Sequence, residues 1–185
     1  MTTTQYQGRP RSALLICGSL RARSTNAAAL RTIQVDAPPE IACRFYEGMG
    51  DLPHFNPDLE DHLPESVQKL RSEIHSSDAI LLSTPEYAGA LPGSLKNLLD
   101  WTIGDAEPGS IYEKPIGWLN VSPRGARGAL AELRTVLEYA HARIIHDAVA
   151  DVPISLDAVG AGGLIRDPAI RGQLALVLRN VVGTS

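Results

Sequence analysis

The sequence GSLRARSTN, residues 18–26, decides the fold because it joins two segments of opposite character. The residues before it, 13–17, read ALLIC, a short and wholly apolar run typical of a strand that is buried on both faces. The residues after it, 27–30, read AAAL and strongly prefer the helix. The stretch is therefore expected to follow a buried strand and to open a helix.

The polar residues of this stretch predict a phosphate site. Ser24, Thr25 and Asn26 are residue types that cap helix N-termini. A helix N-terminus presents unpaired N–H groups and about half a positive charge. Ser19 adds a hydroxyl, and Arg21 adds a full positive charge with a planar fork of donors. Together these groups suit a phosphate; the alternative is an ordinary strand-to-helix turn with a capped helix.

Apolar runs and helical patterns alternate five times along the chain. Strands are expected at residues 12–17, 41–46, 79–83, 115–121 and 144–149, and helices at 24–34, from about 64, at 94–101, after 128 and at about 168–181. This alternation predicts an α/β protein with a doubly wound parallel sheet and helices on both faces. A chain that begins on a central strand suits the flavodoxin-like order 2-1-3-4-5. In that order, the loops after the first and third strands meet where ligands bind, and the loop after the fourth lies beside them.

Length and composition limit the classes of protein to which this chain could belong. The 185 residues suffice for one domain, expected at 12–185, after a flexible tail at 1–11. A net charge of −4 argues against nucleic acid as a partner, and no apolar run reaches the ~20 residues of a membrane helix. The two cysteines, Cys17 and Cys43, fall in predicted buried strands. They are expected to be reduced in a cytoplasmic protein, with a disulfide between the strands as the alternative. No His or Cys cluster has metal-ligand spacing.

Two motifs carry a resemblance to a known family. The first is G-S-L-R-x-x-S-x-N at residues 18–26, and the second is P-E-Y-x-x-x-x-P-G-x-L-K-N-x-x-D-W at 85–101. The chain resembles, over about residues 12–149, the NADPH-dependent FMN reductase family, a flavodoxin-like group that includes quinone, azo-dye and chromate reductases. The resemblance implies bound FMN, NADPH or NADH as electron donor, a small acceptor such as a quinone, free flavin, azo dye or metal oxyanion, and a homodimer or homotetramer.

The family pattern also implies which residues hold the flavin. The FMN phosphate is expected at Arg21, with Ser19, Ser24, Thr25 and Asn26 around it, and the ring against Pro85, Glu86, Tyr87 and Ala88, with Ser122, Pro123, Arg124 and Gly125 closing the pocket. The backbone of Glu86 is expected to make the contact, because its negative side chain would disfavour a reduced anionic flavin. No catalytic side chain is expected, since a flavin carries the redox chemistry itself.

The chain departs from the family pattern in two places. Ala88 stands where the family usually has Asn, so a side chain that bonds the flavin or holds the loop is absent. The loop after the fourth strand usually carries paired glycines, and here it contains Arg124 and Arg127. Either arginine is a candidate for favouring NADPH over NADH or for a subunit contact.

Three further expectations concern function and surface. The alternative function is a flavodoxin-like electron-transfer or flavin-binding module without its own NAD(P)H turnover, although flavodoxins tend to be far more acidic than this chain. A third possibility is a regulatory relative that has lost both flavin and turnover, for which Ala88 is the hint. Trp101, Trp118 and Tyr112 are candidates for apolar surface in oligomerisation, and for Trp101 a place in the core is the alternative. No histidine has a partner that the sequence identifies: His75 is expected at the surface, and His141 and His146 lie at the fifth strand.

Overall fold

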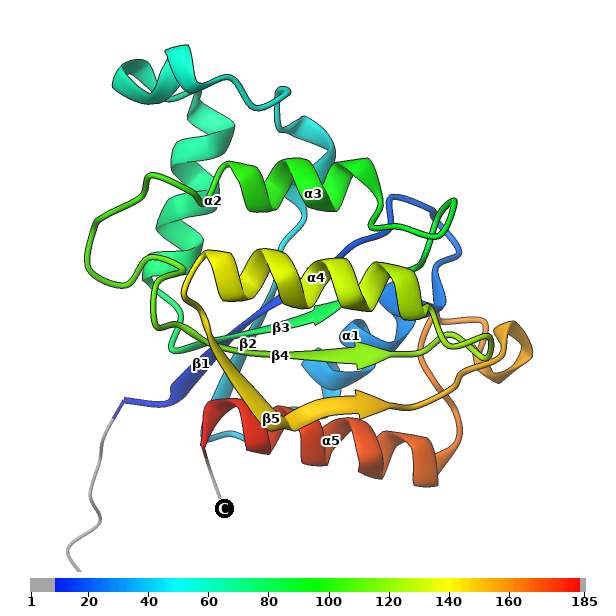
Figure 1. Cartoon of the computed structure of the whole chain (residues 1–185). Helices are drawn as coiled ribbons and strands as arrows, with labels where there is room; N and C mark the ends of the chain where they lie inside the picture. Colours follow the sequence, from blue (N-terminus) through cyan, green and yellow to red (C-terminus); the bar gives the residue numbers. More distant parts are fainter. Residues whose placement is uncertain (1–8, 184–185) are drawn as a thin grey trace, which may run out of the picture.

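The computed structural model describes residues 9–183, which form one three-layer α/β unit (Figure 1). The strands are β1 (Arg11–Cys17), β2 (Ile41–Phe45), β3 (Ala79–Ser83), β4 (Pro115–Asn120) and β5 (Arg143–Asp151). The helices are α1 (Thr25–Asp36), α2 (Glu65–His75), α3 (Gly93–Asp100), α4 (Arg127–Tyr139) and α5 (Pro168–Val182), with short 3-10 helices η1 (Gly48–Asp51), η2 (Pro57–His62) and η3 (Leu156–Ala158). All paired strands are parallel in the order β2-β1-β3-β4-β5, which confirms the predicted sheet.

Two apolar cores cover the two faces of the sheet. Alternate residues of β1 point to opposite sides: Leu15 packs with α1 and α5, whereas Leu14 packs with α2, α3 and α4. Helices α1 and α5 therefore cover one face of the sheet, and α2, α3 and α4 cover the other (Figure 1). Burial on both faces explains why β1 and β3 read as unbroken apolar runs. Among residues 9–183 no helix is both long enough and apolar enough to cross a membrane.

The elements lie where the sequence predicts them, with small shifts at their ends. β1 begins one residue earlier than expected, at Arg11, and residues 1–8 of the predicted tail lie outside the described residues. β5 is longer than expected, since it runs from Arg143 to Asp151. Cys43 is only half-buried, because β2 is an edge strand whose side chains alternate between core and solvent. Both cysteines are free thiols.

Both tryptophans are buried, which agrees with the core alternative for Trp101 and rules out Trp118 as apolar surface. Trp101 is fully buried, and its indole Nε1 donates to the Pro53 carbonyl at 2.8 Å. Trp118 is also buried, within the core under α4. Of the three aromatic residues predicted to supply surface, Tyr112 alone is exposed. His75 also differs from expectation, since its Nε2 lies 2.7 Å from Asp105 Oδ2.

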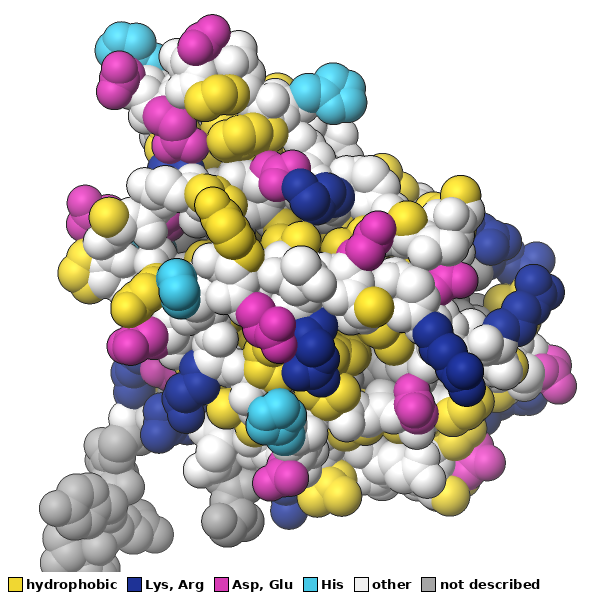
Figure 2. Space-filling view, viewed as in Figure 1, with side chains coloured by type: hydrophobic (Ala, Val, Ile, Leu, Met, Phe, Trp, Pro, Cys, Tyr) yellow, Lys and Arg dark blue, Asp and Glu magenta, His cyan; other side chains and the backbone are white. Residues whose placement is uncertain are grey.

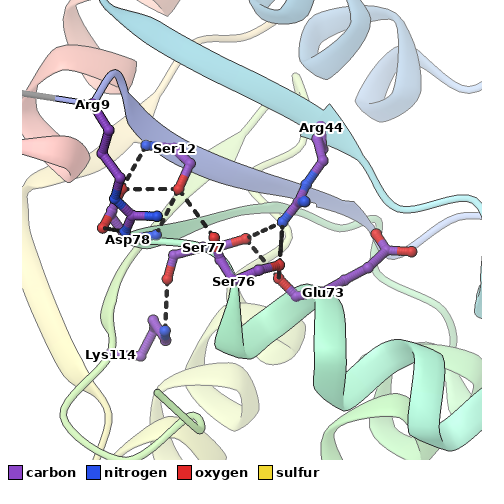
Figure 3. Close-up of polar contacts among 8 residues, drawn as sticks. All are labelled: Arg9, Ser12, Arg44, Glu73, Ser76, Ser77, Asp78 and Lys114. Carbon is purple, nitrogen blue, oxygen red and sulfur yellow. Dashed lines mark hydrogen bonds and ion pairs between the residues drawn. The ribbon is translucent and has the colours of Figure 1, made fainter. Parts of the chain in front are cut away.

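A polar network joins the amino-terminal ends of the central strands, away from the edge that carries the predicted site (Figure 3). Asp78 accepts hydrogen bonds from the Ser12 N–H at 2.8 Å and from the Arg9 guanidinium at 2.7 Å. Burial raises the pKa of Asp78, but its hydrogen bonds with Ser12 and the nearby Arg9 outweigh that effect and leave the pKa below its ordinary value. Lys114 donates to the Ser77 carbonyl at 2.7 Å, and burial lowers its pKa.

Candidate flavin site

The loops after β1 and β3 touch at the switch point of the sheet. The Gly18 N–H donates to the Ser83 carbonyl at 2.8 Å. A Cβ placed on Gly18 would lie 2.4 Å from Thr84 Oγ1, closer than any real contact, so only glycine fits there. The first residue of the first motif thus lets the two loops approach, and both loops face one site.

The N-terminus of α1 is prepared for an anion. Ser24 caps the helix, and its hydroxyl accepts from the Ala27 N–H at 3.3 Å. The N–H groups of Thr25 and Asn26 have no acceptor within residues 9–183, and no acidic residue occupies the first turn. Arg21 is exposed and has no ion-pair partner in the described chain. Free donors, a helix dipole and an unpaired arginine therefore converge at the position predicted for the phosphate.

Asn26 has a structural role that the motif did not reveal. Its side chain is buried, and Oδ1 accepts from Ser83 Oγ at 2.8 Å. The same Ser83 hydroxyl lies 3.0 Å from the Leu119 carbonyl. These contacts join α1 to β3 and β4, so the oxygen of the Asn26 amide holds the site together while its backbone N–H remains available.

The second motif begins with a tight turn. Tyr87 and Ala90 exchange two backbone hydrogen bonds, each 3.1 Å long. Between them, Ala88 has φ 52° and Gly89 has φ 77°, both in the left-handed region. Two positive φ values define a type I′ turn, for which Asn-Gly is the preferred pair. Ala88 thus occupies the position where the family's usual Asn fits this backbone best.

The turn is fixed to α4 by two carboxylates from different elements. Glu86 Oε2 accepts from the Ala129 N–H at 3.1 Å, which caps a helix whose own N-cap, Ala126, supplies no side-chain bond. In return, Glu132 of α4 accepts from the Leu91 N–H at 2.7 Å. The Glu86 carboxylate is therefore engaged by the positive end of α4, and its charge is partly compensated there.

Close packing reinforces this contact. A Cβ placed on Gly128 would lie 2.0 Å from the Gly89 carbonyl oxygen, so α4 can start against the turn only because residue 128 is glycine. The loops after β3 and β4 consequently form one wall of the site.

Asn120 shapes the loop after β4. It is buried at the end of the strand, and its Nδ2 donates to the Gly125 carbonyl and to Asp151 Oδ1, each at 2.7 Å. Its Oδ1 accepts from the Ser122 N–H at 3.1 Å. One side chain thus holds both ends of the loop from Ser122 to Gly125 and fixes the loop to β5.

These loops enclose a cavity of about 400 Å³ at the carboxyl edge of the sheet. Its lining contains every residue predicted for the flavin except Ala88 and Gly125: Ser19, Arg21, Ser24, Thr25, Asn26, Pro85, Glu86, Tyr87, Ser122, Pro123 and Arg124. Three arginines line this cavity, Arg21, Arg23 and Arg124, and basic side chains are visible at this edge of the molecule on the right of Figure 2. The structure thus brings three distant segments into one site.

The cavity lining also contains Arg23, Ala126 and Leu156, which the sequence reasoning missed. Arg23 lies inside the first motif, so its charge was a visible signal that the motif pattern treats as a variable position. Leu156 gave no signal, because it follows β5 in a segment without a recognisable pattern. It is half-exposed and reaches the site only through the path of the chain between β5 and α5.

Comparison with known proteins decides the family. The sequence pattern of the NADPH-dependent FMN reductases matches residues 12–154, which include all of these loops up to the end of β5. The chain belongs to this family. The matched region contains the five strands from β1 to β5 apart from the first residue of β1.

Individual relatives agree with this membership. A quinone reductase of Pseudomonas putida is 39% identical over 118 residues, 63% of this chain and 62% of that protein. An NAD(P)H-dependent FMN reductase of Pseudomonas aeruginosa is 30% identical over 159 residues, 84% of this chain and 85% of that protein. The solved flavoenzyme NAD(P)H:(acceptor) oxidoreductase of Paracoccus denitrificans superposes with a TM-score of 0.79 at 30% identity, covering 92% of this chain and 97% of that one.

Proposed function

We propose that this protein binds FMN in the cavity of about 400 Å³ and passes electrons from NADPH or NADH through it to a small acceptor such as a quinone. The observation that carries the proposal is that Arg21 and the N-terminus of α1, where two N–H groups have no acceptor within residues 9–183, line the same cavity as Tyr87. Two relatives, a quinone reductase and an NAD(P)H-dependent FMN reductase, support the same class of reaction.

The residues present fit FMN. Its dianionic phosphate would be held by Arg21 and the N-terminus of α1, where no acidic residue opposes it in the first turn. The exposed ring of Tyr87 and the carbon skeleton of Pro85 would give the flavin a flat surface. Bound FMN supplies two-electron chemistry, so the protein's part is to bind and orient the reactants.

The arrangement of loops predicts the kinetic order. The loops after β3 and β4 are joined through Glu86 and Gly128 into one wall, against which one face of the flavin is expected to rest. The nicotinamide and the acceptor then share the opposite face, and hydride transfer requires contact at roughly 3–3.5 Å. Two flat molecules cannot occupy that face together, so the oxidised nicotinamide leaves before the acceptor enters. Initial rates should give parallel double-reciprocal lines, whereas converging lines contradict the shared face.

Two measurements test the proposal and separate it from the flavodoxin alternative. Titration of the apoprotein should show FMN binding far more tightly than riboflavin, which lacks the phosphate. The FMN-loaded protein should then consume NADPH in air without any added reductase, whereas an electron-transfer flavodoxin would need one. Equal affinities for the two flavins would refute the phosphate site, and absence of NADPH and NADH oxidation would refute the enzyme.

We further propose a homodimer or homotetramer in the cytoplasm. Symmetric homo-oligomers are the commonest assemblies, and exposed Tyr112 and Tyr139 offer apolar surface to a second copy. The two free thiols are compatible with a reducing compartment. Light scattering that gives a mass near 19.8 kDa at micromolar concentration would contradict the oligomer.

A further inference from the structure

A second cavity, of about 520 Å³, adjoins the candidate flavin pocket. The two cavities share Arg23, Ser24 and Leu156, so the loop after β1 forms part of the wall between them. The other walls of the second cavity come from the first half of α1 and from the loop that joins η3 to α5. Its remaining lining residues are Ala22, Ala27, Ala28, Arg31, Val159, Gly160, Ala161, Gly162 and Gly163. The proposed FMN contacts leave this space unused.

Arg23 is the cation that a ligand in this cavity would meet. It is exposed and has no hydrogen-bond or ion-pair partner within residues 9–183. The other arginine in the lining, Arg31, is already engaged: it pairs with Glu47 at 2.9 Å and lies 4.2 Å over the ring of Phe45. No acidic side chain lines the cavity. The charge available to a ligand in the second cavity is therefore positive, and Arg23 supplies it from the wall shared with the flavin pocket.

The rest of the lining combines small apolar side chains with backbone groups of a glycine-rich loop. Ala27, Ala28 and Val159 present small apolar side chains. In the glycine-rich loop, Gly160 and Gly163 use their N–H groups within the loop, while the N–H groups of Ala161 and Gly162 find no acceptor in the described part of the chain. Apolar surface with a few free donors and one arginine suits an aromatic base that carries a phosphate.

We propose that the second cavity takes the adenosine half of the nicotinamide donor and that Arg23 binds the 2′-phosphate that distinguishes NADPH from NADH. This inference rests on the proposed function. A dinucleotide whose nicotinamide lies on the flavin must place its other half outside a pocket of about 400 Å³ that FMN already occupies. Arg23 lines both cavities, so a dinucleotide that extends from the flavin pocket into the second cavity passes this residue. The Arg23 guanidinium can bind a phosphate with two parallel hydrogen bonds.

The structure distinguishes Arg23 from Arg124 and Arg127, the two arginines that the sequence suggested as candidates for favouring NADPH. Arg124 lines the flavin pocket alone, and Arg127 lines neither cavity. If NADPH preference came from either of them, the second cavity would have no part in it. The test therefore compares the effects of substituting Arg23 and Arg124.

The test uses adenosine 2′,5′-bisphosphate as a probe, titrated by calorimetry into the FMN-loaded protein. It should bind the unmodified protein more tightly than 5′-AMP does. Arg23→Ala should weaken it about 10- to 100-fold, the range expected for one hydrogen bond to a charged group, whereas Arg124→Ala should leave it within a factor of two. Because Arg23 also lines the flavin pocket, FMN affinity is measured for each variant.

A second variant reaches the cavity without touching the flavin pocket. A Cβ on Gly162 meets no atom within 4 Å, and φ at this position is not in the left-handed region, so Gly162→Asp can place a carboxylate there without backbone strain. It should lower kcat/KM for NADPH more than for NADH. Arg179→Ala removes an exposed arginine from the last turn of α5 and should leave the ratio of kcat/KM for NADPH to kcat/KM for NADH unchanged.

Two results would overturn the inference: equal binding of the bisphosphate and 5′-AMP by the unmodified protein, or an unchanged NADPH to NADH ratio in both Arg23→Ala and Gly162→Asp. Failure of the proposed function has a different signature, because neither nicotinamide would then reduce the flavin in any variant. The calorimetric comparison stands without turnover.

Discussion

The left-handed alanine at the tip of the second motif allows a stabilising substitution to be designed. Ala88 has φ 52° and is exposed, so a larger side chain meets no packed neighbour. A left-handed conformation costs an L-residue with an ordinary Cβ about 1–2 kcal/mol, and Asn is one of the few residues that adopt it readily. Ala88→Asn should therefore recover about 1 kcal/mol of the free energy of unfolding.

The gain is measurable as a shift in thermal midpoint. For a chain of this size, about 1 kcal/mol corresponds to a rise in Tm of about 2–4 °C. Ala88→Gly should gain less, because glycine also raises the entropy of the unfolded chain by an equivalent of about 0.4–1 kcal/mol. Ala106→Asn serves as the matched control: Ala106 is an exposed loop alanine without a positive φ, and its substitution should leave Tm unchanged.

The flavin-free protein is the proper sample for this measurement. A gain caused by backbone strain appears in the apoprotein, whereas a gain caused by a new bond to the flavin appears with FMN alone. An apoprotein Tm that stays constant or falls in Ala88→Asn would refute the reasoning from the turn.

Three further predictions concern the anion site, the wall and the opposite edge of the sheet. Arg21→Ala should weaken FMN binding by about 1.5–3 kcal/mol, measured by fluorescence titration, and should leave riboflavin binding unchanged; equal losses for both flavins would contradict a phosphate contact. Gly128→Ala should destabilise the protein by about 1–3 kcal/mol through collision with the Gly89 carbonyl, whereas Gly172→Ala in α5, where a Cβ meets open space, should raise stability. Because the pKa of Asp78 is lowered in the folded state, the contribution of this carboxylate to stability is complete above the unfolded pKa of about 3.9 and is lost as pH falls through the lower folded pKa. The difference in free energy of unfolding between the unmodified protein and Asp78→Asn should therefore shrink as the pH is lowered. A difference that grows below pH ~4 would contradict a lowered pKa.

The fold was predictable because its signals are local and repeated. β1 and β3 are buried on both faces and therefore read as unbroken apolar runs. The chain starts on a central strand, which made the order 2-1-3-4-5 and the switch point the natural expectation. β2 was harder to describe, since an edge strand alternates between core and solvent and leaves Cys43 half-buried.

The parts of the site that escaped prediction depend on contacts between distant segments. The hydrogen bond between Glu86 and the start of α4 joins residues 43 positions apart, so no local sequence pattern predicts it. Asn120 looked like the end of a strand, yet its bond to Asp151 spans 31 positions and holds the wall of the cavity. The sequence left Trp101 between the core and a subunit contact, and it is buried because η1, η2 and the loop between them fold over α3, where Pro53 accepts from its indole.

The central claim is that the cavity holds FMN in a position to accept electrons from NAD(P)H, and an anaerobic half-reaction tests it most directly. The protein is loaded with one equivalent of FMN, mixed with NADPH and with NADH in the absence of any acceptor, and followed by the visible absorbance of the flavin. The account predicts that at least one nicotinamide bleaches the bound flavin and that a quinone added afterwards restores the oxidised spectrum. A bound flavin that keeps its oxidised spectrum with both nicotinamides would contradict it.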